Sequence, residues 1–143
     1  MSVKQVIVIR KDLNMRKGKM IAQGSHASMA VLLEMMRNGK QHKDWVEEMQ
    51  NRYEDYTLSL RVHWDSPLDE WLRGAFTKIC VSVNSEAELN AIYQAAKENG
   101  LPVSMITDNG WTEFHDVPTK TCLAIGPAPA EEIDLITGGL PLL

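Results

Sequence analysis

Cysteine is scarce in this chain, whose 143 residues include only Cys80 and Cys122. Two cysteines cannot build the disulfide framework of a small secreted domain, and these two form no CxxC pair of the kind that holds zinc. Each lies in a short apolar run typical of a strand, so we expect buried thiols in a reducing compartment. Long apolar stretches are also lacking, and the beginning of the sequence has no apolar signal-peptide core. We therefore expect a cytoplasmic protein with no membrane partner.

Motifs for metal or covalent chemistry are lacking too. The four histidines, His26, His42, His63 and His115, show no spacing typical of metal ligands. The sequence has no convincing Ser-His-Asp or Cys-His motif of the kind that covalent hydrolases use. We expect neither a metal nor a cofactor, and any bond cleavage would use water as the nucleophile.

What the sequence does contain is an alternation of apolar runs and helical patterns, which predicts an α/β fold in a single domain over residues 1–143. Its 44% hydrophobic and 24% charged content suits one packed core. A helix is expected to begin near Gly18, another after a capping box at Ser85, ending at Gly100, and a short one over 130–136 after a Gly-Pro-x-Pro turn. The runs typical of strands are 6–9, 79–83, 103–106 and 121–125.

The stretch from 4 to 20 is basic, with six Lys or Arg against the single acid Asp12, although the whole chain carries a net charge of −4. Here Gly18 is expected to let the chain turn tightly into a helix, whose N-terminus favours anions. The pattern predicts an anion-binding turn, although solvated loop charges are the alternative. An acidic chain argues against a nonspecific nucleic-acid coat protein. The residues that would bind an anion here are Arg10, Lys11, Arg16 and Lys17.

Three polar side chains follow one stripe of the first expected helix. Lys19, Gln23 and His26 stand at i, i+4 and i+7 in an otherwise mostly apolar segment. This pattern favours a polar site at the junction of strand and helix, with Gln23 and His26 supporting it. For His26 alone, a structural role in the fold is the alternative.

The residues that follow the first strand resemble the N-terminal signature of the type 2 peptidyl-tRNA hydrolases, the archaeal and eukaryotic kind. The central segment Gly100-Leu101-Pro102-Val103-Ser104 with Asp108-x-Gly110-x-Thr112, and the C-terminal segment that begins at Ala124-Ile125-Gly126-Pro127, resemble that family as well. These blocks lie in the family's order, which is far more specific than one short motif. The signature positions are Arg10, Asp12, Leu13, Met15, Gly18, Lys19, Ala22, Gln23, Ser25, His26 and Ala27.

The resemblance implies a mixed four-stranded sheet, a homodimer, and hydrolysis of the ester that joins a peptide to the 3′ end of tRNA. It also implies the catalytic set Lys19, Asp108 and Thr112. The anions that the basic turn binds would then be RNA phosphates, which makes Arg10, Lys11, Arg16 and Lys17 the candidate RNA-binding residues. We assign Asp108 to orient or deprotonate water, Lys19 to stabilise negative charge, and Thr112 to hydrogen-bond the reacting groups. Asp108 can meet Lys19 if the strands that precede them run parallel. Without the other blocks, Asp108-Asn109-Gly110 would be a common turn sequence.

Three departures from the family leave alternatives open. Asn109 and Glu113 replace the usual Ala and Gln, and the carboxylate of Glu113 could repel an RNA phosphate. A rival hypothesis is therefore a non-catalytic tRNA-binding or regulatory homologue, whereas a general small-molecule carboxylesterase is disfavoured by the basic turn. The segment 39–76 looks about twenty residues longer than usual. The pattern over 42–55 predicts an amphipathic helix, and the period-two alternation over 58–64 predicts a strand or an extended arm. The segment is either a surface that packs its own aromatics or an element that binds a partner or RNA.

Overall fold

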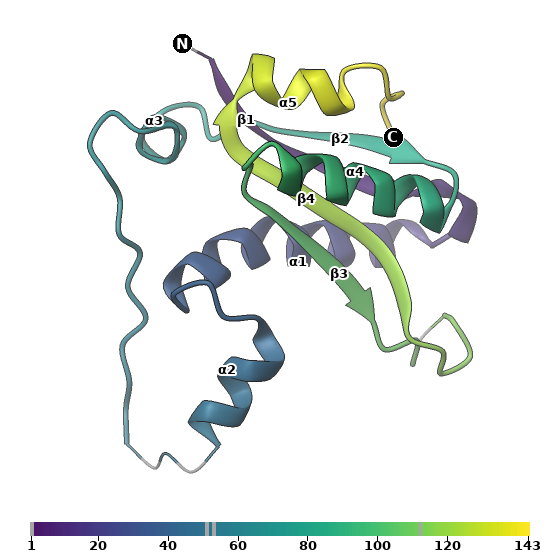
Figure 1. Cartoon of the computed structure of the whole chain (residues 1–143). Coiled ribbons are helices and arrows are strands. Elements are labelled where there is room, and N and C mark those ends of the chain that lie inside the picture. Colours follow the sequence, from purple (N-terminus) through teal and green to yellow (C-terminus); the bar gives the residue numbers. More distant parts are fainter. Residues whose placement is uncertain (1, 51, 53, 112) are drawn as a thin grey trace.

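The computed structural model describes residues 2–50, 52, 54–111 and 113–143, and its centre is a four-stranded sheet in the order β2-β1-β4-β3 (Figure 1). Strand β2 is parallel to β1, whereas β4 is antiparallel to both β1 and β3. Strands β1 and β3 therefore run in the same direction, and the predicted mixed α/β sheet is confirmed. The strands are β1 (Val3–Arg10), β2 (Lys78–Val83), β3 (Val103–Asp108) and β4 (Thr119–Pro129).

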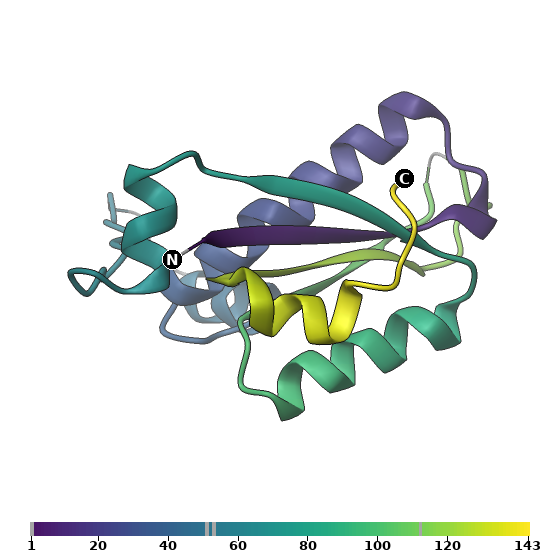
Figure 2. The same ribbon diagram turned by 90° about the horizontal axis from the view of Figure 1, so that it is seen from above.

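Helices cover both faces of this sheet (Figure 2). Helix α1 (Lys17–Met36) lies on one face, and α4 (Glu86–Glu98) and α5 (Ala130–Thr137) lie on the other. Ser85 Oγ accepts a hydrogen bond from the Glu88 backbone N–H at 3.0 Å, so the predicted cap of α4 is confirmed. Three layers thus enclose two apolar clusters, one on each side of the sheet.

Strand β1 is buried on both faces, which explains its continuous apolar sequence. Val6 and Val8 belong to the cluster beneath α4 and α5, and Ile7 and Ile9 to the cluster beneath α1. Successive side chains of a strand point to opposite faces, so one run supplies both clusters. Burial of each such side chain stabilises the fold by about 1.5–3 kcal/mol, and β1 makes this contribution on both faces of the sheet.

Two turns differ from the sequence-based expectation. Gly18 lies inside the first turn of α1, and the tight turn comes earlier, at the 3-10 helix η1 (Lys11–Leu13) and at Asn14, whose φ is 51°. The expected Gly-Pro-x-Pro turn is part of β4, which continues to Pro129. Strand β4 passes this point across a register shift against β1, and Gly126, at φ 99°, accommodates it.

The two cysteines lie in different environments. Cys122 is buried in β4, and desolvation raises the pKa of its thiol to about 12. Cys80 is exposed, contrary to expectation, because β2 is an edge strand that α1 leaves uncovered. An apolar groove of about 610 Å³ lies there, lined by residues of β2, the β1 face and α1. Neither thiol is in a disulfide.

The segment 39–76 leaves the body of the domain after α1 and returns before β2 (Figure 1). It contains α2 (His42–Met49) and α3 (Pro67–Arg73), so the amphipathic helix predicted over 42–55 ends at Met49. The described residues 54–63 form an extended arm without a strand, one of the two forms predicted for 58–64. The Trp45 and Tyr56 rings pack at 5.6 Å between centroids, which favours a surface that packs its own aromatics. Among the described residues, no helix is long and apolar enough to span a membrane.

Candidate active site

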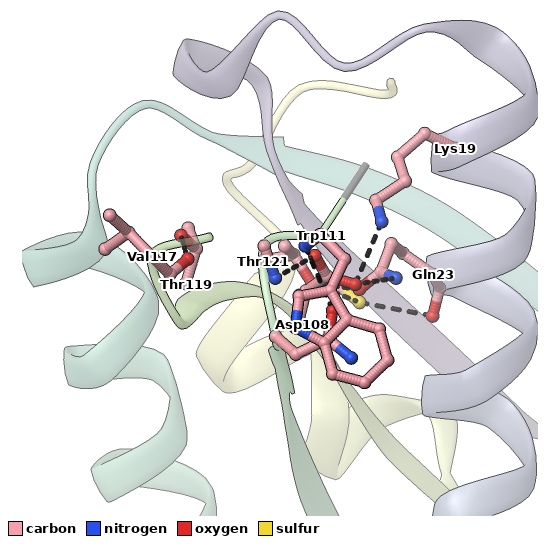
Figure 3. A network of polar contacts seen from close by, with 10 residues as sticks. Lys19, Gln23, Asp108, Trp111, Val117, Thr119 and Thr121 are labelled. Atoms are coloured by element: carbon pink, nitrogen blue, oxygen red, sulfur yellow. Dashed lines mark hydrogen bonds and ion pairs between the residues drawn. The ribbon is translucent and has the colours of Figure 1, made fainter. Parts of the chain in front are cut away.

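The carboxyl ends of β1 and β3 meet at one edge of the sheet because these strands run in the same direction. Lys19 lies in the first turn of α1, which follows β1, and Asp108 is the last residue of β3. The Lys19 ammonium nitrogen donates a hydrogen bond to Asp108 Oδ1 at 2.9 Å (Figure 3). The two side chains are only 14% and 12% exposed, so water screens this ion pair weakly.

Asp108 also accepts hydrogen bonds from Gln23 and from its own loop. Gln23 Nε2 donates to Oδ1 at 3.2 Å, and the Gly110 backbone N–H donates to Oδ2 at 2.9 Å. Burial alone would raise the pKa of the Asp108 carboxyl, but the bonds from Lys19, Gly110 and Gln23 outweigh it and leave the pKa below its ordinary value. At neutral pH the site therefore holds a carboxylate beside an ammonium group.

The orientation of Gln23 is fixed from behind by β4. Its side-chain oxygen accepts a hydrogen bond from Thr121 Oγ1 at 2.5 Å, and its backbone carbonyl accepts one from Cys122 Sγ at 3.3 Å. Gln23 and Thr121 are both buried. Because the amide oxygen is occupied by Thr121, the NH₂ group of Gln23 faces Asp108.

Sequence reasoning missed Thr121. The pairing of β3 with β4 shifts register between Ile106, which faces Cys122, and Thr107, which faces Lys120. Thr121 is the extra residue at this irregularity, and such bulges re-aim a side chain. A polar residue at the start of the predicted strand 121–125, directly before its apolar run, is the signal that could have found it.

The loop that follows Asp108 is held in one shape by Gly110. Its φ is 86°, and a Cβ there would lie 2.3 Å from the Val117 carbonyl oxygen, so only glycine fits. Asn109 Oδ1 accepts a hydrogen bond from the Trp111 backbone N–H at 3.1 Å, which closes a turn beside the site. Thr112, the third predicted catalytic residue, lies outside the described residues.

The family of this chain is decided by comparison with known proteins. The family model described as "Peptidyl-tRNA hydrolase PTH2" matches residues 3–143. The chain belongs to the PTH2 family. It is 41% identical to a peptidyl-tRNA hydrolase of Methanocaldococcus jannaschii over 141 residues, which cover 99% of this chain and 100% of that protein. It is 39% identical to one of Sulfurisphaera tokodaii over 143 residues, covering 100% of both. The resemblance seen in the sequence is thus confirmed.

In this PTH2 chain, only part of the predicted polar stripe reaches the site. Lys19 and Gln23 both contact Asp108, whereas His26 is exposed and makes no hydrogen bond or ion pair with any described residue. The periodicity placed His26 near the same helix face, but one further turn carries it away from the end of β3. The described residues contain no group of three His, Cys, Asp or Glu side chains that could hold a metal ion.

The four candidate RNA-binding residues differ in their exposure. The Arg10 side chain is 11% exposed and bonds within the fold: Nη2 lies 2.7 Å from Asp12 Oδ2, and Nη1 donates to the Lys120 carbonyl oxygen at 3.0 Å. Lys11, Arg16 and Lys17 are exposed. The basic surface beside the site is therefore made by these three and not by Arg10.

Glu113, which replaces the usual Gln of the family, has an ion-pair partner in the structure. Glu113 Oε1 lies 3.8 Å from Arg16 Nε, and the Arg16 side chain is 91% exposed. An ion pair this open to water is weak, on the order of 0–1 kcal/mol. Glu113 thus links the loop after β3 to the basic turn without burying the Arg16 charge.

Proposed function

We propose that this chain hydrolyses the ester between a peptide and the 3′-terminal ribose of tRNA, releasing the peptide and free tRNA. One observation carries the proposal: the weakly screened Lys19–Asp108 pair at the edge of the sheet, 2.9 Å between Nζ and Oδ1. The exposed cations of the neighbouring turn supply charge for a polyanionic substrate. The curated relatives named peptidyl-tRNA hydrolase support the same activity.

In this proposal, water attacks the ester carbonyl. A carboxylate with a lowered pKa is a weak proton acceptor, so Asp108 serves chiefly to orient the water by accepting a hydrogen bond from it. The Lys19 ammonium group stabilises the oxyanion that develops on the carbonyl oxygen. Gln23 holds Asp108 in place through the contact at 3.2 Å. By family resemblance, Thr112 hydrogen-bonds the reacting groups.

The exposed cations Lys11, Arg16 and Lys17 contact tRNA phosphates in this proposal. The position of Arg16 supports this assignment. Arg16 lies beside the loop that carries Glu113, and that loop begins directly after Asp108. Each phosphate neutralised by such a side chain releases condensed counterions, which makes binding depend on salt.

We also propose a cytoplasmic homodimer. The cytoplasm is where translation supplies peptidyl-tRNA. The apolar groove beside β2 supports a contact between two copies, since it carries Ile21 at 70%, Met29 at 49% and Phe76 at 45% exposure. A protruding side chain beside a hollow on the same face suits a self-complementary two-fold contact. Light scattering should give twice the chain mass, and Ile21→Glu should halve it. A monomeric wild-type protein would contradict the dimer.

The decisive experiment measures turnover of purified peptidyl-tRNA by the wild-type protein and by Lys19→Ala. Loss of the ammonium group should lower kcat/KM at least about a hundredfold, on the order of 3 kcal/mol. Circular dichroism must show that the variant is folded. A wild-type protein that binds the substrate without cleaving it would instead support the tRNA-binding or regulatory homologue, and a folded, fully active variant would remove Lys19 from the chemistry.

A further inference from the structure

Trp111 is the most conspicuous side chain that the proposed reaction leaves unused. Its indole is 76% exposed. No ring contact, cation–π contact or ion pair joins the indole to another described residue. By contrast, Trp71 is buried, and Trp64 and Trp45 each have an arginine over the ring, at 4.2 and 4.8 Å. Trp111 therefore presents a large bare aromatic surface to water.

The backbone that carries this indole is held next to the reacting groups by a short turn. Figure 3 shows Trp111 on the loop that leaves β3 directly after Asp108. The Trp111 backbone N–H donates a hydrogen bond to Asn109 Oδ1 at 3.1 Å, and the preceding Gly110 backbone N–H donates one to Asp108 Oδ2 at 2.9 Å. The backbone that carries the ring is thus tied to the carboxylate itself. Because this backbone is ordered before binding, only the rotation of the Trp111 side chain remains to be fixed when a ligand arrives.

The substrate that the proposed function supplies has a matching flat group. If the ester carbonyl lies over the Lys19–Asp108 pair, the terminal base lies beside that pair, because base and ester are attached to the same sugar. The 3′ end of tRNA is single-stranded, so this base is free to stack on an aromatic side chain. Arg16 Nε lies 3.8 Å from Glu113 Oε1, two residues beyond Trp111, so Arg16 is near the same loop and can meet the phosphates on the 5′ side of the terminal base.

We propose that Trp111 stacks on the terminal base of the substrate and so positions the ester over the Lys19–Asp108 pair. This inference rests on the proposed hydrolysis of peptidyl-tRNA and names the part of the substrate that the loop recognises. Stacking on an indole needs a π-face but no hydrogen-bonded base edge, so Trp111 provides affinity and register with little selectivity between bases.

The test compares Trp111→Ala and Trp111→Phe with the wild-type protein on peptidyl-tRNA. Loss of the ring should lower kcat/KM about 5- to 100-fold, chiefly through KM, and Phe should restore most of it. Trp64→Ala is the matched control, because Trp64 is 75% exposed but lies in segment 39–76. The kcat/KM of Trp64→Ala should therefore equal that of the wild type.

A second substrate identifies the group that stacks. On the same peptide esterified to a ribose that lacks a base, Trp111→Ala and the wild type should have equal kcat/KM. An equal loss on both substrates would mean that the ring contacts the peptide, and no loss on peptidyl-tRNA would mean that it contacts nothing; either result overturns the proposal.

A binding measurement separates this inference from the proposed function. Deacylated tRNA should bind Trp111→Ala about 5- to 100-fold more weakly than it binds the wild type and Trp64→Ala. If the wild type cleaves no peptidyl-tRNA, the proposed hydrolysis fails, and this titration still decides whether Trp111 stacks on the 3′ end. Unchanged affinity of Trp111→Ala would overturn the stacking.

Discussion

Replacement of Asp108 by Asn separates chemistry from substrate binding at the candidate site. The carboxylate accepts hydrogen bonds from Lys19 and Gln23 at Oδ1 and from the Gly110 N–H at Oδ2. An amide of nearly the same shape keeps one acceptor oxygen and replaces the other by an NH₂ donor. Whichever way the amide turns, its NH₂ group faces at least one of these donors.

Two losses follow, and their sizes differ. Without the carboxylate that orients water, kcat should fall about 10²–10⁴-fold. The donor group that faces the new NH₂ group has no acceptor, and this lost hydrogen bond lowers folding stability by about 1–3 kcal/mol. Lys19, whose side chain is only 14% exposed, also loses the negative charge that faces it. Affinity for peptidyl-tRNA should stay the same or rise, since one negative charge near the RNA is removed.

Single-turnover cleavage and equilibrium binding of peptidyl-tRNA should be measured on one preparation of Asp108→Asn that circular dichroism shows to be folded. Asp134→Asn is the matched control, because Asp134 pairs with Lys4 at 2.6 Å in the same Lys–Asp arrangement between β1 and α5. The control should keep wild-type kcat. If Asp108→Asn also keeps kcat within a few-fold of wild type, the role of Asp108 in orienting water is refuted.

Three further measurements test the site's charges and backbone. Because the Asp108 carboxyl has a pKa below its ordinary 3.8, its stabilisation of the fold is complete above that value and is lost as pH falls through the lowered one. The difference in urea unfolding free energy between wild type and Asp108→Asn should therefore be constant above about pH 5 and shrink in acid. Replacing Arg16 and Lys17 by Gln should reduce the slope of log affinity for tRNA against log salt by about 1–2; an unchanged slope would leave both as solvated surface charges. Gly110→Ala should lower kcat/KM more than Gly100→Ala, since both glycines have positive φ but a Cβ clashes only at Gly110; equal effects in kinetic assays would contradict this reasoning.

The sequence predicted the architecture of the site because the information was local. The apolar run in β1 and the polar residues at the end of β3 mark two strands. Lys19 lies in the helix that follows the first strand, and Asp108 ends the second. The remaining condition was that these strands run in the same direction, and the structure meets it through the shared antiparallel neighbour β4. Alternation of strands and helices sufficed for the α/β fold, and the cap at Ser85 was readable from residues three positions apart.

The parts that were missed depend on pairing between distant strands. The position of Thr121 behind Gln23 arises from a one-residue register shift between β3 and β4. No pattern within β4 alone specifies that shift, because register is set by which neighbour the strand meets. The exposure of Cys80 has the same origin, since an apolar run does not reveal whether its strand lies at the centre or the edge of a sheet.

The basic turn shows why a count of charges overstates an anion-binding surface. Arg10 and Arg16 contribute equally to that count, yet Arg10 is 11% exposed and bonded to Asp12, whereas Arg16 is 91% exposed. The Asp12 carboxylate two residues beyond Arg10 is the signal that could have predicted this pair. Glu113 partly neutralises Arg16 as well, so a phosphate that binds Arg16 must compete with a carboxylate. Fewer free cations release fewer counterions, and tRNA affinity should therefore depend on salt less steeply than six clustered Lys and Arg residues suggest.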